Sequence, residues 1–170
     1  CEINDIALEA ISSESGRGQF ELSLKHTQDV LNLADGLIFL KNIIRFISRK
    51  NGFAATFMAK PFSNRPGSGL HTHFSLLDKN KSNFFDNGTA MGSDEMLASV
   101  GGLLTHMKQS TLIFAPHSNS YRRLAPNQHA PINLTWGYEN RTAAIRVPGG
   151  EQSNKRIEHR VSGADTNIYL

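Results

Sequence analysis

Two stretches of the chain repeat apolar residues at the three- and four-residue steps of an amphipathic helix. The first runs from Val30 to Ile47, with Asp29 near its start and Lys50-Asn51-Gly52 closing it. The second runs from Ser93, a residue type that caps helix N-termini, to Met107. The pattern predicts a helix over each stretch.

Alternating polarity predicts strands elsewhere. Two of them, Phe53–Lys60 and Leu70–Leu77, are joined by a loop over residues 61–69. After residue 116, short runs bounded by Asn, Gly and Pro predict three more strands, at Ile132–Tyr138, Thr142–Val147 and Arg156–Val161. Such short connections suit antiparallel pairing. We therefore expect an α+β fold with helices on a mainly antiparallel sheet, and no linker marks a domain boundary within residues 1–170.

Composition excludes several classes of protein. Of the 170 residues, 39% are hydrophobic and 19% are charged, which indicates a folded chain and not a disordered one. The most apolar stretch, Leu31–Ile47, is interrupted by Asp35, Lys41 and Arg45, so no membrane span is expected. The single cysteine, Cys1, excludes an intrachain disulfide and favours a cytoplasmic setting. The net charge is +3, but the basic residues are spread among carboxylates, which disfavours a nucleic-acid-binding module.

Two histidines and a serine share one face of the expected strand at residues 70–77. Because side chains alternate along a strand, His71, His73 and Ser75 point the same way. Alone, this pattern also fits a half-buried strand with two hydrogen-bonded histidines. The preceding loop at residues 65–69 contains two glycines that let backbone amides approach an anion, which favours a binding site.

Carboxylates and arginines form two further candidate groups. Arg156, Glu158 and Arg160 share one strand face, which suits either a solvated edge with weak ion pairs or a site for a metal and an anion. Glu14 and Glu21 flank a Gly-x-Gly turn. Carboxylates with one or two imidazoles suit Mg²⁺ or Mn²⁺ better than zinc. With several arginines and a glycine loop, they suggest phosphoryl transfer from a nucleotide, although no P-loop sequence is present.

Six motifs follow one another over nearly the whole chain: Gly18–Glu21, Lys60-Pro61, Gly67–Ser75, Asn119–Leu124, Asn140–Pro148 and Arg156–Arg160. Together they resemble the catalytic domain of glutamine synthetases. The resemblance implies a curved, mainly antiparallel sheet of the guanido-kinase-like kind with helices packed on it. It also implies ATP-dependent ligation, in which the γ-carboxylate of glutamate is phosphorylated and an amine then displaces phosphate from γ-glutamyl phosphate.

The resemblance also implies a role for each matching position. Glu14 and Glu21 match ligands of a metal ion beside glutamate, and His71 and Glu158 match ligands of a metal ion, Mg²⁺ or Mn²⁺, that bridges the nucleotide phosphates. The positions that match nucleotide contacts are His73, Ser75 and Arg156. Those that match the grip on glutamate are Gly67, Arg123 and Arg160. The positions that match residues neutralising the transferring phosphoryl group of ATP are Arg141 and Arg146.

One position departs from the family pattern. Six residues after the arginine that matches Arg123, the family usually has a glutamate that helps to bind ammonium and takes its proton, but this chain has His129. The segments Trp136–Thr142 and Glu158–Asp165 are more similar to the branch that joins glutamate to putrescine or other polyamines. The choice between an organic amine and ammonia stays open.

The resemblance further implies a β-grasp domain and a helical C-terminal part outside residues 1–170. We therefore expect this chain to be a partial catalytic domain, inactive alone, from a cytoplasmic ring-shaped homo-oligomer that acts on small molecules. The alternative is a catalytically inactive structural protein with the same fold. The four matched metal-ligand positions are all filled, which favours the enzyme.

Overall fold

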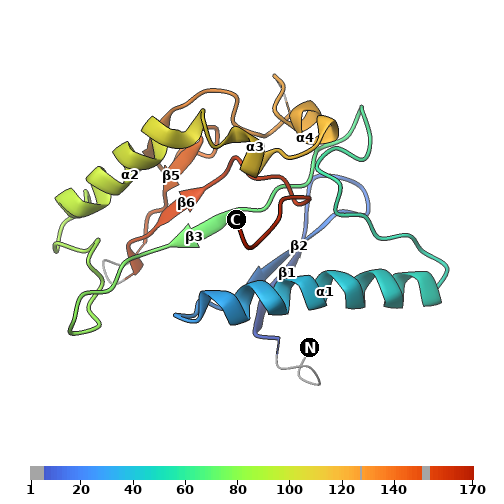
Figure 1. Cartoon of the computed structure of the whole chain (residues 1–170), viewed down its shortest axis with the longest axis horizontal. Helices are drawn as coiled ribbons and strands as arrows, with labels where there is room; N and C mark the ends of the chain where they lie inside the picture. Colours follow the sequence, from blue (N-terminus) through green and yellow to red (C-terminus); the bar gives the residue numbers. More distant parts are fainter. Residues whose placement is uncertain (1–5, 127, 151–153) are drawn as a thin grey trace. The chain divides into compact units, whose positions relative to one another are not determined.

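The computed structural model describes residues 6–126, 128–150 and 154–170. The chain divides into two compact units, and each is described by itself because their relative positions are not determined (Figure 1). The first unit holds the described residues up to Phe57, together with Pro61–Pro66 and Asn167–Leu170. The second unit holds Met58–Lys60 and the described residues from Gly67 to Thr166.

The first unit contains a hairpin and a long helix. Strands β1 (Leu8–Ser13) and β2 (Phe20–Leu24) pair antiparallel. Helix α1 (Val30–Lys50) follows, and the side chain of Asp29 accepts a hydrogen bond of 3.0 Å from the backbone N–H of Asn32. This contact satisfies one of the donors that every helix start leaves unpaired, and it explains why the helix begins where the sequence predicts.

The second unit contains a four-stranded sheet in the order β3-β6-β5-β4 (Figure 1). Its strands are β3 (Thr72–Phe74), β4 (Trp136–Tyr138), β5 (Ile145–Val147) and β6 (Ile157–His159). The β3–β6 and β5–β6 pairs are antiparallel, whereas β4 and β5 are parallel. The helices of this unit are α2 (Asp94–Met107), α3 (Thr111–Phe114) and α4 (Ser118–Arg123).

The core of the second unit forms where α2 packs on this sheet. Met96, Val100 and Met107 lie on the inner side of the helix, each with at most 2% exposure. They belong to the same buried cluster as Ile145 and Ile157, which are fully buried on β5 and β6. Burial of these side chains fixes one face of the sheet against the helix and leaves the opposite face for polar side chains.

The structure confirms both long helices and the mixed α+β class but not every strand. The strand predicted at residues 53–60, all of which the structure describes, does not form. The carbonyl of Ala59 accepts from the N–H of Ser68, and the N–H of Lys60 donates to the Asn119 side chain at 2.9 Å, so loop contacts use these backbone groups instead of a strand ladder. The other predicted strands are shortened to three residues each. Helices α3 and α4 were not predicted, because one or two turns carry too little periodicity.

Helix α1 is 21 residues long, but no helix in the described ranges is both long and apolar enough to cross a membrane.

Two methionines test the packing of α2. We expect Met96→Ala to lower the free energy of unfolding by about 2–5 kcal/mol, since Met96 is fully buried and its removal leaves a cavity. Met91 is 57% exposed, so Met91→Ala should change stability by less than about 0.5 kcal/mol. Urea denaturation of the two variants measures both values, and equal effects would show that α2 does not pack as described.

Candidate functional site

Three neighbouring strands place one polar residue each in a row across the sheet. His73 on β3 lies opposite Glu158 on β6, and Glu158 lies opposite Arg146 on β5. Because side chains alternate, the strand neighbours of Arg146 and Glu158 lie on the core side, where Ile145, Val147, Ile157 and His159 are buried. Ile157 therefore packs under α2 while Glu158, the next residue, points to the other face.

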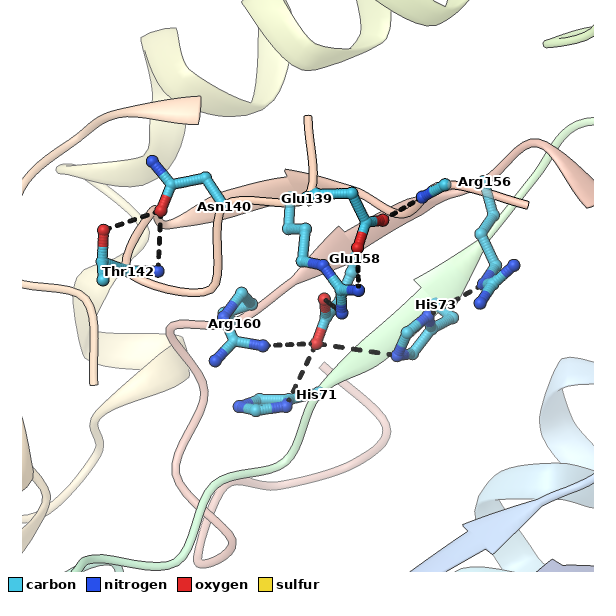
Figure 2. A network of polar contacts seen from close by, with 10 residues as sticks. His71, His73, Glu139, Asn140, Thr142, Arg156, Glu158 and Arg160 are labelled. Carbon is cyan, nitrogen blue, oxygen red and sulfur yellow. Dashed lines mark hydrogen bonds and ion pairs between the residues drawn. The ribbon is translucent and has the colours of Figure 1, made fainter. Parts of the chain in front are cut away.

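The carboxylate of Glu158 is the centre of this face. Figure 2 shows His71, His73 and Arg160 directed toward it. Its Oε1 atom lies 2.6 Å from the Arg160 guanidinium, 3.2 Å from His71 Nδ1 and 3.8 Å from His73 Nε2. Its Oε2 atom accepts a hydrogen bond of 2.9 Å from Arg146. Only 3% of the Glu158 side chain is exposed, so these contacts replace water around a buried charge.

These surroundings shift the pKa values of the site. Burial alone would raise the pKa of Glu158, but the hydrogen bond from His71 and the charge of Arg160 outweigh burial and lower that pKa to about 2. Burial also lowers the pKa of His73, partly opposed by the charge of Glu158. At neutral pH the site therefore holds an ionised carboxylate beside a neutral His73 imidazole.

Two more residues extend the contacts around Glu158. Arg146 also forms an ion pair of 3.1 Å with Glu139, which follows β4. On the opposite side, Arg156 Nε donates to His73 Nδ1 at 3.2 Å. We call the set joined by these contacts the Glu158 network; its members are His71, His73, Glu139, Arg146, Arg156, Glu158 and Arg160.

Arg123 supports the site from within the protein. It is 3% exposed, and its two terminal nitrogens donate to the backbone carbonyls of Val161 and Arg160, at 2.7 and 3.1 Å. Burial and the charge of Arg160 lower the pKa of Arg123 to about 10. A Cβ atom on Gly67 would lie 2.9 Å from the Arg123 side chain and 2.5 Å from the Ala59 carbonyl oxygen, so only glycine fits there.

His71 and Glu158 are the residues of the second unit that could contact a metal ion. His71 Nδ1 and Glu158 Oε1 are close enough to share one cation, and an imidazole with a carboxylate suits Mn²⁺ or Mg²⁺. Across residues 6–126, 128–150 and 154–170, however, no three His, Cys, Asp or Glu side chains converge to hold a metal. His71 and Glu158 therefore suit such an ion, but they supply only part of the ligands that it needs.

Other residues singled out from the sequence share no hydrogen bond or ion pair with this network in the described parts of the chain, although the charge of Arg141 helps to lower the pKa of Glu139. In the second unit, Ser75, His129 and Arg141 are exposed, and His129 has a positive φ of 57°. In the first unit, Glu14 and Glu21 are exposed near the turn that connects β1 and β2. The Glu14 N–H donates to the Gln19 carbonyl and Glu21 lies opposite Ser12, so strand alternation places both carboxylates on one face of the hairpin.

Sequence reasoning missed two residues. Glu139 contacts Arg146 from a residue with a left-handed backbone conformation, with a φ of 52°. No local sequence pattern predicts that conformation. His159 is 6% exposed on the core side of β6, where its ring packs 4.4 Å from that of Phe114. Burial lowers the pKa of His159 to about 4, so it is neutral at pH 7. Alternation along a strand puts His159 on the face opposite Glu158, but no sequence pattern marks it as deeply buried.

The Glu158 network combines two carboxylates, two histidines and three guanidiniums on one face of a small sheet. Guanidiniums pair with carboxylate and phosphate groups, so this set of side chains suits an anionic ligand. The model for the catalytic domain of glutamine synthetase matches residues 1–170. The chain therefore belongs to the glutamine synthetase family.

Curated relatives support the assignment over nearly the whole chain. Gamma-glutamylputrescine synthetase PuuA of Escherichia coli is 39% identical over 158 residues, which cover 93% of this chain and 34% of that protein. A glutamine synthetase of Pyrococcus horikoshii is 38% identical over 162 residues, covering 95% and 36%. A glutamate–isopropylamine ligase of a Pseudomonas species is 41% identical over 170 residues, covering 97% and 36%. The chain spans about a third of the length of these relatives.

The shifted pKa of Glu158 predicts how stability depends on pH. A carboxyl group whose pKa falls from 4.5 to about 2 on folding stabilises the folded state above pH 4.5, and this contribution is lost as the pH falls toward 2. We expect Glu158→Gln to be less stable than the wild type at pH 7, with the difference shrinking below pH 4.5. Urea denaturation between pH 7 and pH 3 measures it, with exposed Glu95→Gln as the control. A difference independent of pH would contradict this account.

Proposed function

We propose that the protein containing this chain is an ATP-dependent ligase that joins the γ-carboxylate of glutamate to an amine through γ-glutamyl phosphate. The observation that carries this proposal is the row of His73, Glu158 and Arg146 with Arg160 beside it, in a chain that belongs to the glutamine synthetase family. The names of the relatives, which include ligases for putrescine and isopropylamine, support an amine as the second substrate.

Within this proposal, the second unit forms part of a catalytic domain whose curved sheet presents the Glu158 network to ATP and glutamate. His71 and Glu158 would hold one divalent ion, and Glu14 and Glu21 would hold another. Such ions, when bound, neutralise phosphate charge. The cytoplasmic ring-shaped homo-oligomer implied by the resemblance belongs to the same proposal.

The arginines would act on the charges of the reaction. Arg146 and Arg141 would neutralise the phosphoryl group during transfer, because guanidiniums pair with phosphate oxygens through two hydrogen bonds. The buried surroundings of Arg146, whose side chain is 13% exposed, strengthen such an interaction. The proposed nucleotide contacts are His73, Ser75 and Arg156.

Glutamate would lie near Gly67, Arg123 and Arg160. Arg123 already donates to two backbone carbonyls, but a guanidinium carries five N–H groups. It can therefore hold the end of β6 in place and still donate to a substrate carboxylate. Arg160 forms a hydrogen bond of 2.6 Å with Glu158, which links the proposed glutamate grip to the proposed metal ligands.

We further propose that the amine is organic and not ammonia. Ammonium binding needs negative charge, and at the corresponding position His129 offers an exposed imidazole without a fixed negative charge. An imidazole can accept a proton from a bound amine, so His129 fits the catalytic base for an amine held by other contacts.

ADP release by the full-length protein tests both proposals. With ATP, Mg²⁺ and glutamate, we expect putrescine, spermidine, ethanolamine or isopropylamine to stimulate turnover more than ammonium at equal concentration. His129→Glu should raise the ammonium-dependent rate about tenfold, which is a barrier change of about 1.4 kcal/mol. His26→Glu, at an exposed position in the first unit, is the matched control.

Two outcomes would contradict the proposals separately. Turnover of the wild type with ammonium alone would refute the organic amine and make another group responsible for ammonium binding. No ADP release with any amine would refute the ligase itself.

A further inference from the structure

Arg146 lies between two carboxylates. One terminal nitrogen donates to Glu158 Oε2 at 2.9 Å, and the other donates to Glu139 Oε2 at 3.1 Å. The two partners differ in their surroundings, because the side chain of Glu158 is 3% exposed whereas that of Glu139 is 58% exposed. Glu139 is thus a carboxylate at the rim of the site that reaches inward to a nearly buried guanidinium.

The backbone holds Glu139 in this position. Its N–H donates to the Val147 carbonyl at 3.0 Å, which extends the pairing of β4 with β5 by one residue. Its φ of 52° then turns the chain away, a conformation that costs a non-glycine residue energy and needs local support. That support includes the N–H of Gly149, which donates to Glu139 Oε1. A Cβ atom at position 149 would lie only 3.2 Å from the same oxygen.

The two oxygens of Glu139 therefore have separate tasks. Oε1 is fixed by the backbone of Gly149, and Oε2 is left to orient Arg146. Arg146 depends on this orientation, because its buried Nε atom has no hydrogen-bond partner among the described residues. Its other partner is Glu158 Oε2, and the second oxygen of that carboxylate also contacts His71 and Arg160.

We propose that Glu139 is a positioning residue for Arg146, which keeps the guanidinium directed into the site when a ligand engages Glu158. This inference rests on the proposed function of the Glu158 network, since it assigns Glu139 a part in that reaction. Glu139 does not touch the reacting groups itself. It acts by limiting the positions open to the Arg146 side chain.

Chemical modification tests the proposal without relying on activity. The full-length protein is treated with phenylglyoxal, and the rate of modification at each arginine is measured by mass spectrometry of peptides. In Glu139→Gln the side chain keeps one acceptor oxygen, so it cannot accept from both Gly149 and Arg146. We expect the less restrained Arg146 to react about tenfold faster than in the wild type. Arg123 and Arg160 should react at unchanged rates, which excludes general unfolding. Glu95→Gln, at an exposed carboxylate on α2, should change none of the three rates.

Kinetics test the same proposal through the reaction. Glu139→Gln should lower kcat about tenfold and leave the KM for glutamate within about twofold, because the guanidinium is misplaced and not removed. In an Arg146→Ala background, Glu139→Gln should have no further effect, since a residue that acts only through another loses its influence with that partner. Additive losses in the two variants would overturn the proposal.

The two experiments separate this inference from the proposed function. If the wild type shows no ligase activity, the proposed function fails, and the modification rates still decide whether Glu139 positions Arg146. An unchanged rate at Arg146 in both Glu139→Gln and Glu139→Ala would overturn the inference even in an active ligase.

Discussion

The second unit depends on keeping one buried carboxylate charged. With 3% of its side chain exposed, Glu158 would be strongly destabilising without partners, and removing one partner of a buried pair leaves an uncompensated charge. Its partners come from three separate segments, since Arg146 lies on β5, Arg160 follows β6 and His71 precedes β3. The strands of this sheet are only three residues long, so these side-chain contacts help the backbone pairing to hold them together.

The same strands also carry the core, which ties the site to the fold. A shift of one residue between β5 and β6 would place Arg146 opposite Ile157 or His159 instead of Glu158, and it would move Ile145 away from the residues it packs with. Both changes cost free energy, one through an unpaired buried charge and the other through lost packing. The register that places His73, Glu158 and Arg146 in a row is therefore also the register that closes the core under α2.

Local patterns predicted some of this arrangement. Alternation placed Glu158 and Arg160 on one face, and apolar periodicity with a capping residue found α1 and α2 close to their observed starts. The strands that pair with β6 could not be predicted from local patterns, because residues 72–74 and 145–147 are distant in sequence from their partners at residues 157–159. The strand predicted at residues 53–60 failed for a related reason, since apolar and β-branched content shows that a strand can form but not that a partner strand is present. Glu139 was missed because its place depends on a backbone turn.

The charge on this face indicates what the site can bind. Arg146, Arg156 and Arg160 set three guanidiniums against the two carboxylates of Glu139 and Glu158. The lowered pKa of His73 keeps its imidazole neutral at pH 7, so it adds no charge of its own, yet one guanidinium remains in excess. The guanidinium without a carboxylate partner is that of Arg156, which is partly exposed and donates to His73 instead. Within the proposed function, a nucleotide phosphate would offset that excess and would accept the guanidinium N–H groups that the carboxylates leave available. In that proposal, the guanidiniums that stabilise the buried carboxylate of Glu158 in the free protein would also bind the polyanionic substrate.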